Sequence, residues 1–316
     1  MNMTEPSMNY QVIKREDWRK LGQTASNDVK SKLTPQVLSE LKAFNDQISL
    51  DEVDAIYKPL VAYIKTQYRQ YGQDRKVQAE FLEQPQTPSP FVIGIAGSVA
   101  VGKTTTAQLL QYLLQAEFGQ SEVALATTDG FLRSNEELVQ QGIMERKGFP
   151  ESYNMPKLLE FVDAIKDGDE EIRAPKYSHD ISDVLPNEYD YFKRPKIFIL
   201  EGINTLQATP DAPVYLSDFF DLSIYLDADT DLIAHWYLDR FVALLNQTAQ
   251  AQDPNNFFYS WTQMPFDQAI SQARQVWETV NLPNLEDYIL PTRERADLIL
   301  HKTVGHIIDE IWLRKF

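Results

Sequence analysis

Cysteine is absent from this sequence of 316 residues. Its absence excludes disulfide bonds, a thiolate nucleophile and a cysteine-held zinc or iron–sulfur centre. Long hydrophobic runs are also missing, so we expect no membrane-spanning helix. The N-terminus is polar and lacks the apolar core of a signal peptide, which favours a cytoplasmic protein.

Basic side chains are few, because 30 Lys and Arg stand against 46 Asp and Glu, a formal net charge of −16. Proteins that bind DNA or RNA rely on basic patches that neutralise phosphates. The charge balance therefore argues against a nucleic acid as partner. The four histidines are not spaced with one another or with acids as a metal pair on one helix face, so zinc chemistry is not expected.

One octet carries most of the functional information. Residues 97–104 read Gly-Ser-Val-Ala-Val-Gly-Lys-Thr, the G-x-x-x-x-G-K-[ST] phosphate-binding pattern. An apolar run at 91–96 predicts a buried strand before it, and a helix is predicted over about 102–118 after it. This context separates the motif from a chance glycine-rich turn. We expect a nucleoside triphosphate site.

The chemistry of that site follows from the residue types in the octet. Backbone N–H groups and the helix N-terminus hold phosphate oxygens, Lys103 reaches the β- and γ-phosphates, and the Thr104 hydroxyl holds Mg²⁺. The predicted nucleotide-binding residues are Gly97, Ser98, Val99, Ala100, Val101, Gly102, Lys103, Thr104 and Thr105.

Short apolar runs alternate with helical patterns from residue 91 onward. Strands are predicted at 91–96, 123–127, 197–200, 222–226 and 298–300, and helices at about 102–118, 156–167, 231–250, 265–280 and 303–314. This alternation predicts an α/β fold with a mostly parallel sheet and helices on both faces. We interpret residues 1–90 as a helical extension, loose over the first 30 residues, and 91–316 as the core, with a lid around 236–262.

Two acids follow predicted strands, at the edge of a parallel sheet where ligands bind. Asp129 follows the strand at 123–127 and would lie near the γ-phosphate if that strand adjoins the one at 91–96. There it could orient and deprotonate an attacking hydroxyl, and a purely structural Asp-Gly turn is the alternative. Glu201 could support Mg²⁺, and a loop carboxylate or a buried ion-pair partner is the alternative. Arg240, within the predicted lid, could neutralise charge on a transferred phosphoryl group or lie in a surface ion pair.

Several longer blocks also occur in the order and spacing of a known family. They are residues 97–104, 127–131, 147–153, 177–179, 200–202, 236–241 and 290–296. On these blocks the sequence resembles prokaryotic type I pantothenate kinases, which have a P-loop kinase fold and lie near uridine kinase and phosphoribulokinase. The similarity runs from about Leu41 to Arg314.

The resemblance implies that ATP and Mg²⁺ are used to phosphorylate pantothenate to 4'-phosphopantothenate, the first step of coenzyme A biosynthesis, in a homodimer. It implies that Asp129 is the catalytic base and that Lys103 and Arg240 stabilise the transferred group. The residues implied to line the pantothenate site are Tyr177, His179, Tyr237, Arg240 and Asn281. Those implied to approach the adenine are Asn45, Lys302 and His306.

Two positions depart from the family pattern. Gln108 replaces an arginine and Leu244 replaces a phenylalanine, at positions that in the family help coenzyme A to bind as a feedback inhibitor. Losing a charged donor removes a phosphate partner, and losing an aromatic ring removes packing. We therefore expect weakened inhibition by coenzyme A.

Two other functions stay open at the level of sequence. A kinase of the same fold could act on another hydroxyl, such as that of uridine or ribulose phosphate, since function depends on the acceptor site. A nucleotide-dependent switch protein is the second alternative. No Asn-Lys-x-Asp motif for reading guanine occurs, which argues against a GTP switch.

Overall fold

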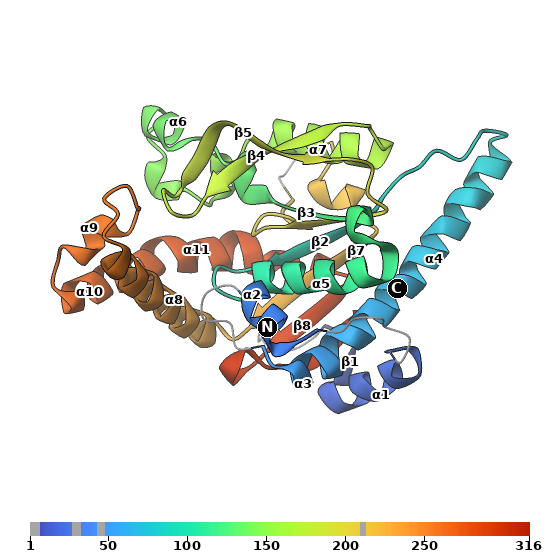
Figure 1. Ribbon diagram of the computed structural model, residues 1–316, viewed down its shortest axis with the longest axis horizontal. Coiled ribbons are helices and arrows are strands. Elements are labelled where there is room, and N and C mark those ends of the chain that lie inside the picture. The colour runs from blue at the N-terminus through green and yellow to red at the C-terminus, as the bar shows by residue number, and fades with distance from the viewer. Residues whose placement is uncertain (1–6, 27–32, 43–47, 209–212) are drawn as a thin grey trace.

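The computed structural model describes residues 7–26, 33–42, 48–208 and 213–316 (Figure 1). Within them the main sheet has the strand order β1-β9-β8-β7-β2-β6-β3. The strands are β1 Tyr10–Lys14, β2 Phe91–Gly97, β3 Val123–Thr127, β6 Ile197–Glu201, β7 Leu222–Ala228, β8 Leu298–Lys302 and β9 Ile308–Arg314. The five strands predicted from the sequence are confirmed, and they are the parallel ones.

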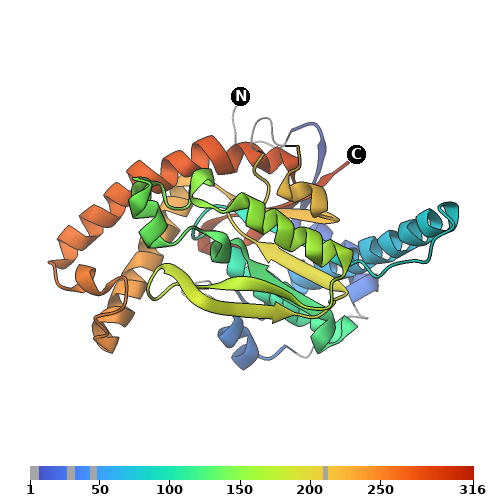
Figure 2. The ribbon, with the colours of Figure 1, turned by 90° about the horizontal axis from the view of Figure 1, so that it is seen from above.

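Helices cover both faces of the sheet, as the fold class predicted (Figure 2). Alternate residues of the central strand β2 point to opposite faces. Ile93 and Ile95 join a hydrophobic cluster with α4 (Lys58–Phe81) and α5 (Lys103–Phe118). Val92 joins a second cluster with α7 (Met155–Asp167). Burial on both faces explains why the parallel strands are continuous apolar runs.

The predicted loose structure of the first 30 residues is wrong where the structure describes them. Residues 10–26 form β1 and α1 (Arg15–Ser26), and β1 pairs antiparallel with β9 at the sheet edge. Trp18 is buried, and its indole N–H donates to the Ile56 carbonyl at 3.2 Å. The N-terminal segment thus contributes a strand to the main sheet as well as helices.

Two side chains of the N-terminal extension cap helices. The Thr34 hydroxyl caps α2 (Pro35–Leu41) by accepting from Val37 N at 3.3 Å, and the Ser49 hydroxyl accepts from Glu52 N at 3.1 Å at the start of α3 (Leu50–Glu52). Glu52 does not cap in return. Its carboxylate pairs with Arg15 and accepts from the Ile308 backbone at 2.9 Å, which fastens the extension to β9.

The helix predicted over 303–314 is wrong. A short turn at Val304–His306 leads into β9, which pairs antiparallel with β8. Gly305 and His306 both have positive φ, 72° and 62°, so the chain reverses instead of continuing as a helix. The apolar residues 304, 307, 308 and 311 recur three and four positions apart, and this spacing imitates a helix.

Two further units flank the sheet. The sequence reading missed the hairpin of β4 (Ile172–Ser178) and β5 (Asp183–Phe192). The other unit, here called the arm, consists of α8 (Thr230–Ala251), α9 (Tyr259–Thr262) and α10 (Phe266–Val276). It has a small hydrophobic cluster of its own, formed by Phe241, Leu245, Ala269 and Ala273. Among the shorter helices are α6 (Asn135–Gln140) and α11 (Leu282–Asn284).

Candidate active site

The phosphate-binding loop lies between the end of β2 and the start of α5, as predicted. Three of its residues have positive φ: Gly97 at 146°, Ala100 at 61° and Gly102 at 93°. Such alternation turns successive N–H groups toward one point and forms an anion-binding concavity. A Cβ atom on Gly97 would lie 2.8 Å from the Leu226 carbonyl oxygen, so only glycine fits there.

Lys103 and Glu201 lie together beside this loop. The Lys103 ammonium donates to the Ser98 carbonyl at 2.8 Å. Desolvation lowers the pKa of Lys103, whereas the carboxylates of Glu201 and Asp129 act in the opposite direction. Burial raises the pKa of Glu201, and Lys103 is the largest influence that opposes this shift. The two acids thus favour the charged form of this lysine, against the effect of its burial.

Thr104 and Glu201 fit a magnesium ion. The Thr104 hydroxyl donates to the Glu201 carboxylate at 3.0 Å, so the two oxygen ligands already converge. Within the ranges that the structure describes, no three His, Asp or Glu side chains group as a complete metal site. Mg²⁺ is commonly held by one or two protein oxygens together with phosphate oxygens and water.

Asp129 lies near Lys103 although its strand is not a neighbour of β2. The sequence hypothesis required β3 to lie next to β2, but β6 lies between them. Asp129 belongs to a tight turn after β3, where its backbone N–H donates to the Thr127 hydroxyl at 3.3 Å. Its charge nevertheless influences the pKa of Lys103 and of His179. The carboxylate thus lies between the phosphate loop and the hairpin.

Gly130 brings the hairpin close to Asp129. A Cβ atom there would lie 2.0 Å from the Pro175 carbonyl oxygen, which is backbone and cannot swing away. We expect Gly130→Ala to lower the free energy of unfolding by about 1–3 kcal/mol and to reduce turnover. Urea unfolding and steady-state kinetics measure both effects. Gly72→Ala, in α4 with no atom within 4 Å of the new Cβ, is the matched control and should be neutral or slightly stabilising. Equal behaviour of the two variants would contradict the argument.

The hairpin side of the site holds Tyr177 and His179. Their rings are 5.1 Å apart, and the Tyr177 hydroxyl lies 3.1 Å from Ser182 Oγ. Burial raises the pKa of Tyr177 to about 12. Desolvation lowers the pKa of His179, opposed by Asp129 and assisted by Arg240. His179 is therefore a neutral hydrogen-bonding group near neutral pH.

The arm side holds the other predicted acceptor residues. Arg240, on α8, lies close enough for its charge to influence the pKa of both Lys103 and His179. Burial raises the pKa of Tyr237 to about 12, opposed by a hydrogen bond with Asn281. The Tyr237 ring also packs 5.6 Å from that of Trp277. Asp129 and Arg240 are therefore both close enough to Lys103 for their charges to act on it.

Lys302 and His306 lie on the β8 side of the phosphate loop. The buried Lys302 ammonium donates to the Val101 carbonyl at 2.8 Å. The His306 ring stacks on Trp236 with centroids 3.9 Å apart. Asn45, the third predicted adenine-side residue, lies outside the described residues.

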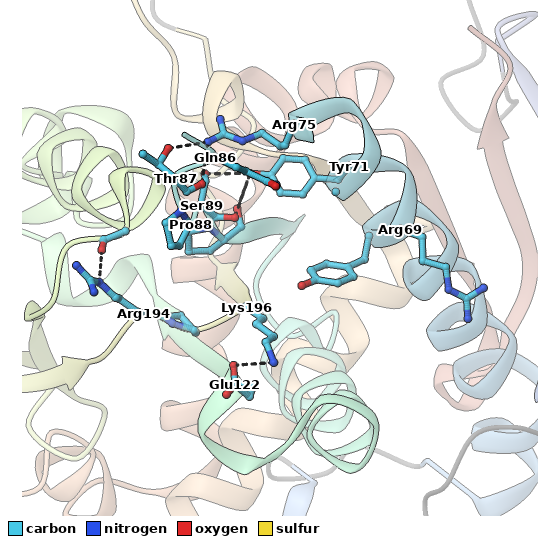
Figure 3. Close-up of a pocket in the computed structure, with 15 residues that line it drawn as sticks. Arg69, Tyr71, Arg75, Gln86, Thr87, Pro88, Ser89, Glu122, Arg194 and Lys196 are labelled. Carbon is cyan, nitrogen blue, oxygen red and sulfur yellow. Dashed lines mark hydrogen bonds and ion pairs between the residues drawn. The ribbon is translucent and has the colours of Figure 1, made fainter. Parts of the chain in front are cut away.

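A separate groove occurs at the opposite edge of the sheet (Figure 3). It has a volume of about 580 Å³ and lies between α4, the linker at 86–90 and the segment before β6. Three of its four cations are already engaged: Arg75 donates to Thr87, Arg194 donates to the Gly168 carbonyl, and Lys196 pairs with Glu122 at 3.4 Å. It lies at the amino ends of the parallel strands, away from the phosphate loop, so the candidate active site is not there.

Comparisons with known proteins agree with this geometry. Residues 92–244 match the model of the Phosphoribulokinase / Uridine kinase family. The chain is 50% identical to a pantothenate kinase of Enterococcus faecalis over 312 residues, and 49% identical to one of Levilactobacillus brevis over 314, each covering 99% of this chain and all of the relative. The chain belongs to the pantothenate kinase family. D-glycerate 3-kinase of Cryptococcus neoformans shares the fold, with a TM-score of 0.53 at 14% identity over 79% of this chain and 98% of that one.

Lys147, which was not among the predicted site residues, lies beside one of them, Tyr177. The Lys147 ammonium donates to Asn135 Oδ1 at 2.8 Å and lies 5.5 Å from the centre of the Tyr177 ring. Desolvation lowers the pKa of Lys147, opposed by Asp183 and Asp129. The signal was present in the sequence, because Lys147 opens one of the blocks that carry the resemblance.

No helix in the described part of this chain combines the length and apolarity needed to cross a bilayer.

Proposed function

We propose that this chain phosphorylates pantothenate to 4'-phosphopantothenate with ATP, the first step of coenzyme A biosynthesis. The proposal depends on one observation: this chain aligns with pantothenate kinases over 99% of its length, at 49% and 50% sequence identity. The convergence of Asp129, Lys103 and Arg240 supports it, because phosphoryl transfer needs an acid beside the acceptor and cations around the transferred group.

The transfer proceeds in line in this proposal. The primary hydroxyl of pantothenate attacks the γ-phosphorus, a new O–P bond forms, the bond to the β,γ-bridging oxygen breaks, and ADP leaves. Asp129 accepts the hydroxyl proton, while Lys103 and Arg240 stabilise charge on the transferred group. Mg²⁺, held by Thr104 and Glu201, would neutralise phosphate charge. Tyr177, His179, Tyr237 and Asn281 would bind the rest of pantothenate.

Other parts of the proposal concern the nucleotide and the assembly. Asn45, Lys302 and His306 would lie near the adenine, and residues 236–262 would act as the lid. We also propose a homodimer and a division of the chain near residue 90. Analytical ultracentrifugation of the full chain tests the first of these, and a monomer at micromolar concentration would contradict it.

An acceptor panel with labelled ATP tests the function. Pantothenate, uridine and ribulose 5-phosphate are supplied separately with Mg²⁺, and labelled phosphopantothenate is the expected product. Phosphorylation of uridine or the sugar phosphate without pantothenate would favour another kinase of the same fold. Slow ATP hydrolysis that no acceptor accelerates would favour a nucleotide-dependent switch.

Inhibition by coenzyme A is expected to be weak in this chain. Gln108 on α5 and Leu244 on α8 lack the charge and the aromatic ring expected at these positions for binding coenzyme A. Inhibition is measured as the ATP KM against coenzyme A concentration. The double variant Gln108→Arg, Leu244→Phe should gain inhibition while its ATP KM without coenzyme A stays unchanged. Tight ATP-competitive inhibition of the unmodified chain at low micromolar concentration would contradict this prediction.

A further inference from the structure

The walls of the proposed acceptor site come from two separate units. Tyr177 and His179 belong to β4 and the turn that follows it, whereas Tyr237 belongs to the arm. Among the described residues, the outer part of the arm packs around its own cluster, separate from the two clusters that cover the sheet. A unit with its own core can move as a body about its attachment. The direct contacts between arm and hairpin therefore decide how far the two walls separate.

Two hydrogen bonds join the hairpin turn to the loop between α8 and α9. The Phe257 backbone N–H donates to the Asp180 carbonyl at 2.6 Å, and Asn256 Nδ2 donates to the Asp180 carboxylate at 3.4 Å. Figures 1 and 2 both show the turn between β4 and β5 at the same end of the molecule as α9. These two hydrogen bonds are called the clasp below.

Asn256 is held in position from within the arm. Its Oδ1 accepts from the Phe258 backbone N–H at 2.9 Å and lies 3.2 Å from Thr248 Oγ1, and Thr248 is buried in α8. An asparagine side chain that accepts from the backbone two residues on fixes a turn. The amide group thus meets Asp180 from a preformed loop, which lowers the entropic cost of closing the clasp.

Asp180 is fixed to the acceptor side of the hairpin in turn. It follows His179 directly, and its charge is among those that influence the pKa of His179. Ser182, which lies beside the Tyr177 hydroxyl, ends the same turn. Displacement of Asp180 would therefore carry both His179 and the partner of Tyr177 with it.

We propose that the clasp holds the acceptor site closed, and that Asp180 and Asn256 are positioning residues that set the affinity for the acceptor. The inference rests on the proposed function. With the clasp open, the arm and hairpin separate and the acceptor dissociates before transfer. The phosphate loop lies on the core of the sheet, and the inner end of α8 packs into that core through Ile233 and Trp236, so we expect nucleotide binding to be independent of the clasp.

Steady-state kinetics of Asp180→Ala and Asn256→Ala test the proposal. We expect the KM for pantothenate to rise by about three- to tenfold, the scale of one lost hydrogen bond, with kcat and the ATP KM within about twofold of the unmodified chain. Asp180→Asn is the matched control. It loses the same charge as Asp180→Ala but keeps an oxygen that accepts from Asn256, so its pantothenate KM should stay near that of the unmodified chain.

Hydrogen exchange supplies a readout that needs no turnover. The peptide around Phe257 should exchange faster in Asp180→Ala and Asn256→Ala, while peptides of α5 stay unchanged. An unchanged pantothenate KM, an equal rise in the ATP KM, or equal impairment of Asp180→Asn and Asp180→Ala would overturn the proposal. If the unmodified chain makes no phosphopantothenate, the proposed function fails, and exchange still reports whether the clasp forms.

Discussion

Asp129→Ala is expected to lower kcat by about two to four orders of magnitude, the range for losing a positioned general base. Asp129 lies in a tight turn between the phosphate loop and the hairpin, where its charge influences the pKa of Lys103 and Tyr177. It is thus placed between the nucleotide side and the acceptor side. Because it contacts the acceptor and not the triphosphate in our proposal, ATP should still bind with near-normal affinity.

The measurement separates chemistry from binding. Turnover is followed as labelled phosphopantothenate, and ATP affinity by calorimetry on the same samples. Asp129→Asn keeps the size of the side chain but cannot accept a proton, so it should be nearly as slow as the alanine variant. Asp163→Ala, an exposed acid on α7, is the matched control and should be fully active. A rate within about threefold of the unmodified chain for Asp129→Ala would remove this residue from the mechanism.

Lys103→Ala should weaken both nucleotide binding and turnover, because the lysine contacts the triphosphate in the ground state and in the transition state. Its ammonium now donates to the Ser98 carbonyl and faces Glu201 and Asp129. Removing it leaves Glu201, which is 6% exposed, without the cation that favours its charged form. We expect kcat/KM for ATP to fall by roughly two to three orders of magnitude.

Two controls make this result specific. Lys157→Ala removes an exposed lysine from α7 and should leave all kinetic constants unchanged. Lys103→Arg keeps the positive charge but replaces the compact ammonium with a planar guanidinium. Partial activity of this variant would indicate that the charge matters more than the shape of the group. Unaltered ATP binding in Lys103→Ala would contradict the assignment of this lysine to the triphosphate.

The parallel strands and the phosphate loop could be predicted because their signals are local. An apolar run, a glycine pattern and a helix start lie within 30 consecutive residues at 91–119, and both glycine positions have the φ that the loop requires. The hairpin β4–β5 gave no such signal, since most side chains of β5 are polar and at least partly exposed. For β9 the apolar spacing fitted a helix, and only pairing with β8 decided otherwise.

The same distinction between local and long-range signals applies to the individual site residues. Lys103 and Thr104 belong to the loop motif itself, whereas Asp129 was assigned on the condition that its strand adjoined β2. That condition is not met, yet the turn after β3 and the close approach of Gly130 to Pro175 carry Asp129 to the site. Lys147 needed the fold before its position beside Tyr177 was evident.

The sequence alone determined which residues form the phosphate-binding loop and how strands and helices alternate, because both features depend on neighbours along the chain. Tertiary structure decided which strands are adjacent, how the N-terminal strand closes the sheet edge, and where Asp180 meets Asn256, residues 76 positions apart. These contacts join segments distant in sequence. Their energies depend on the packing of the whole fold, which no local pattern encodes.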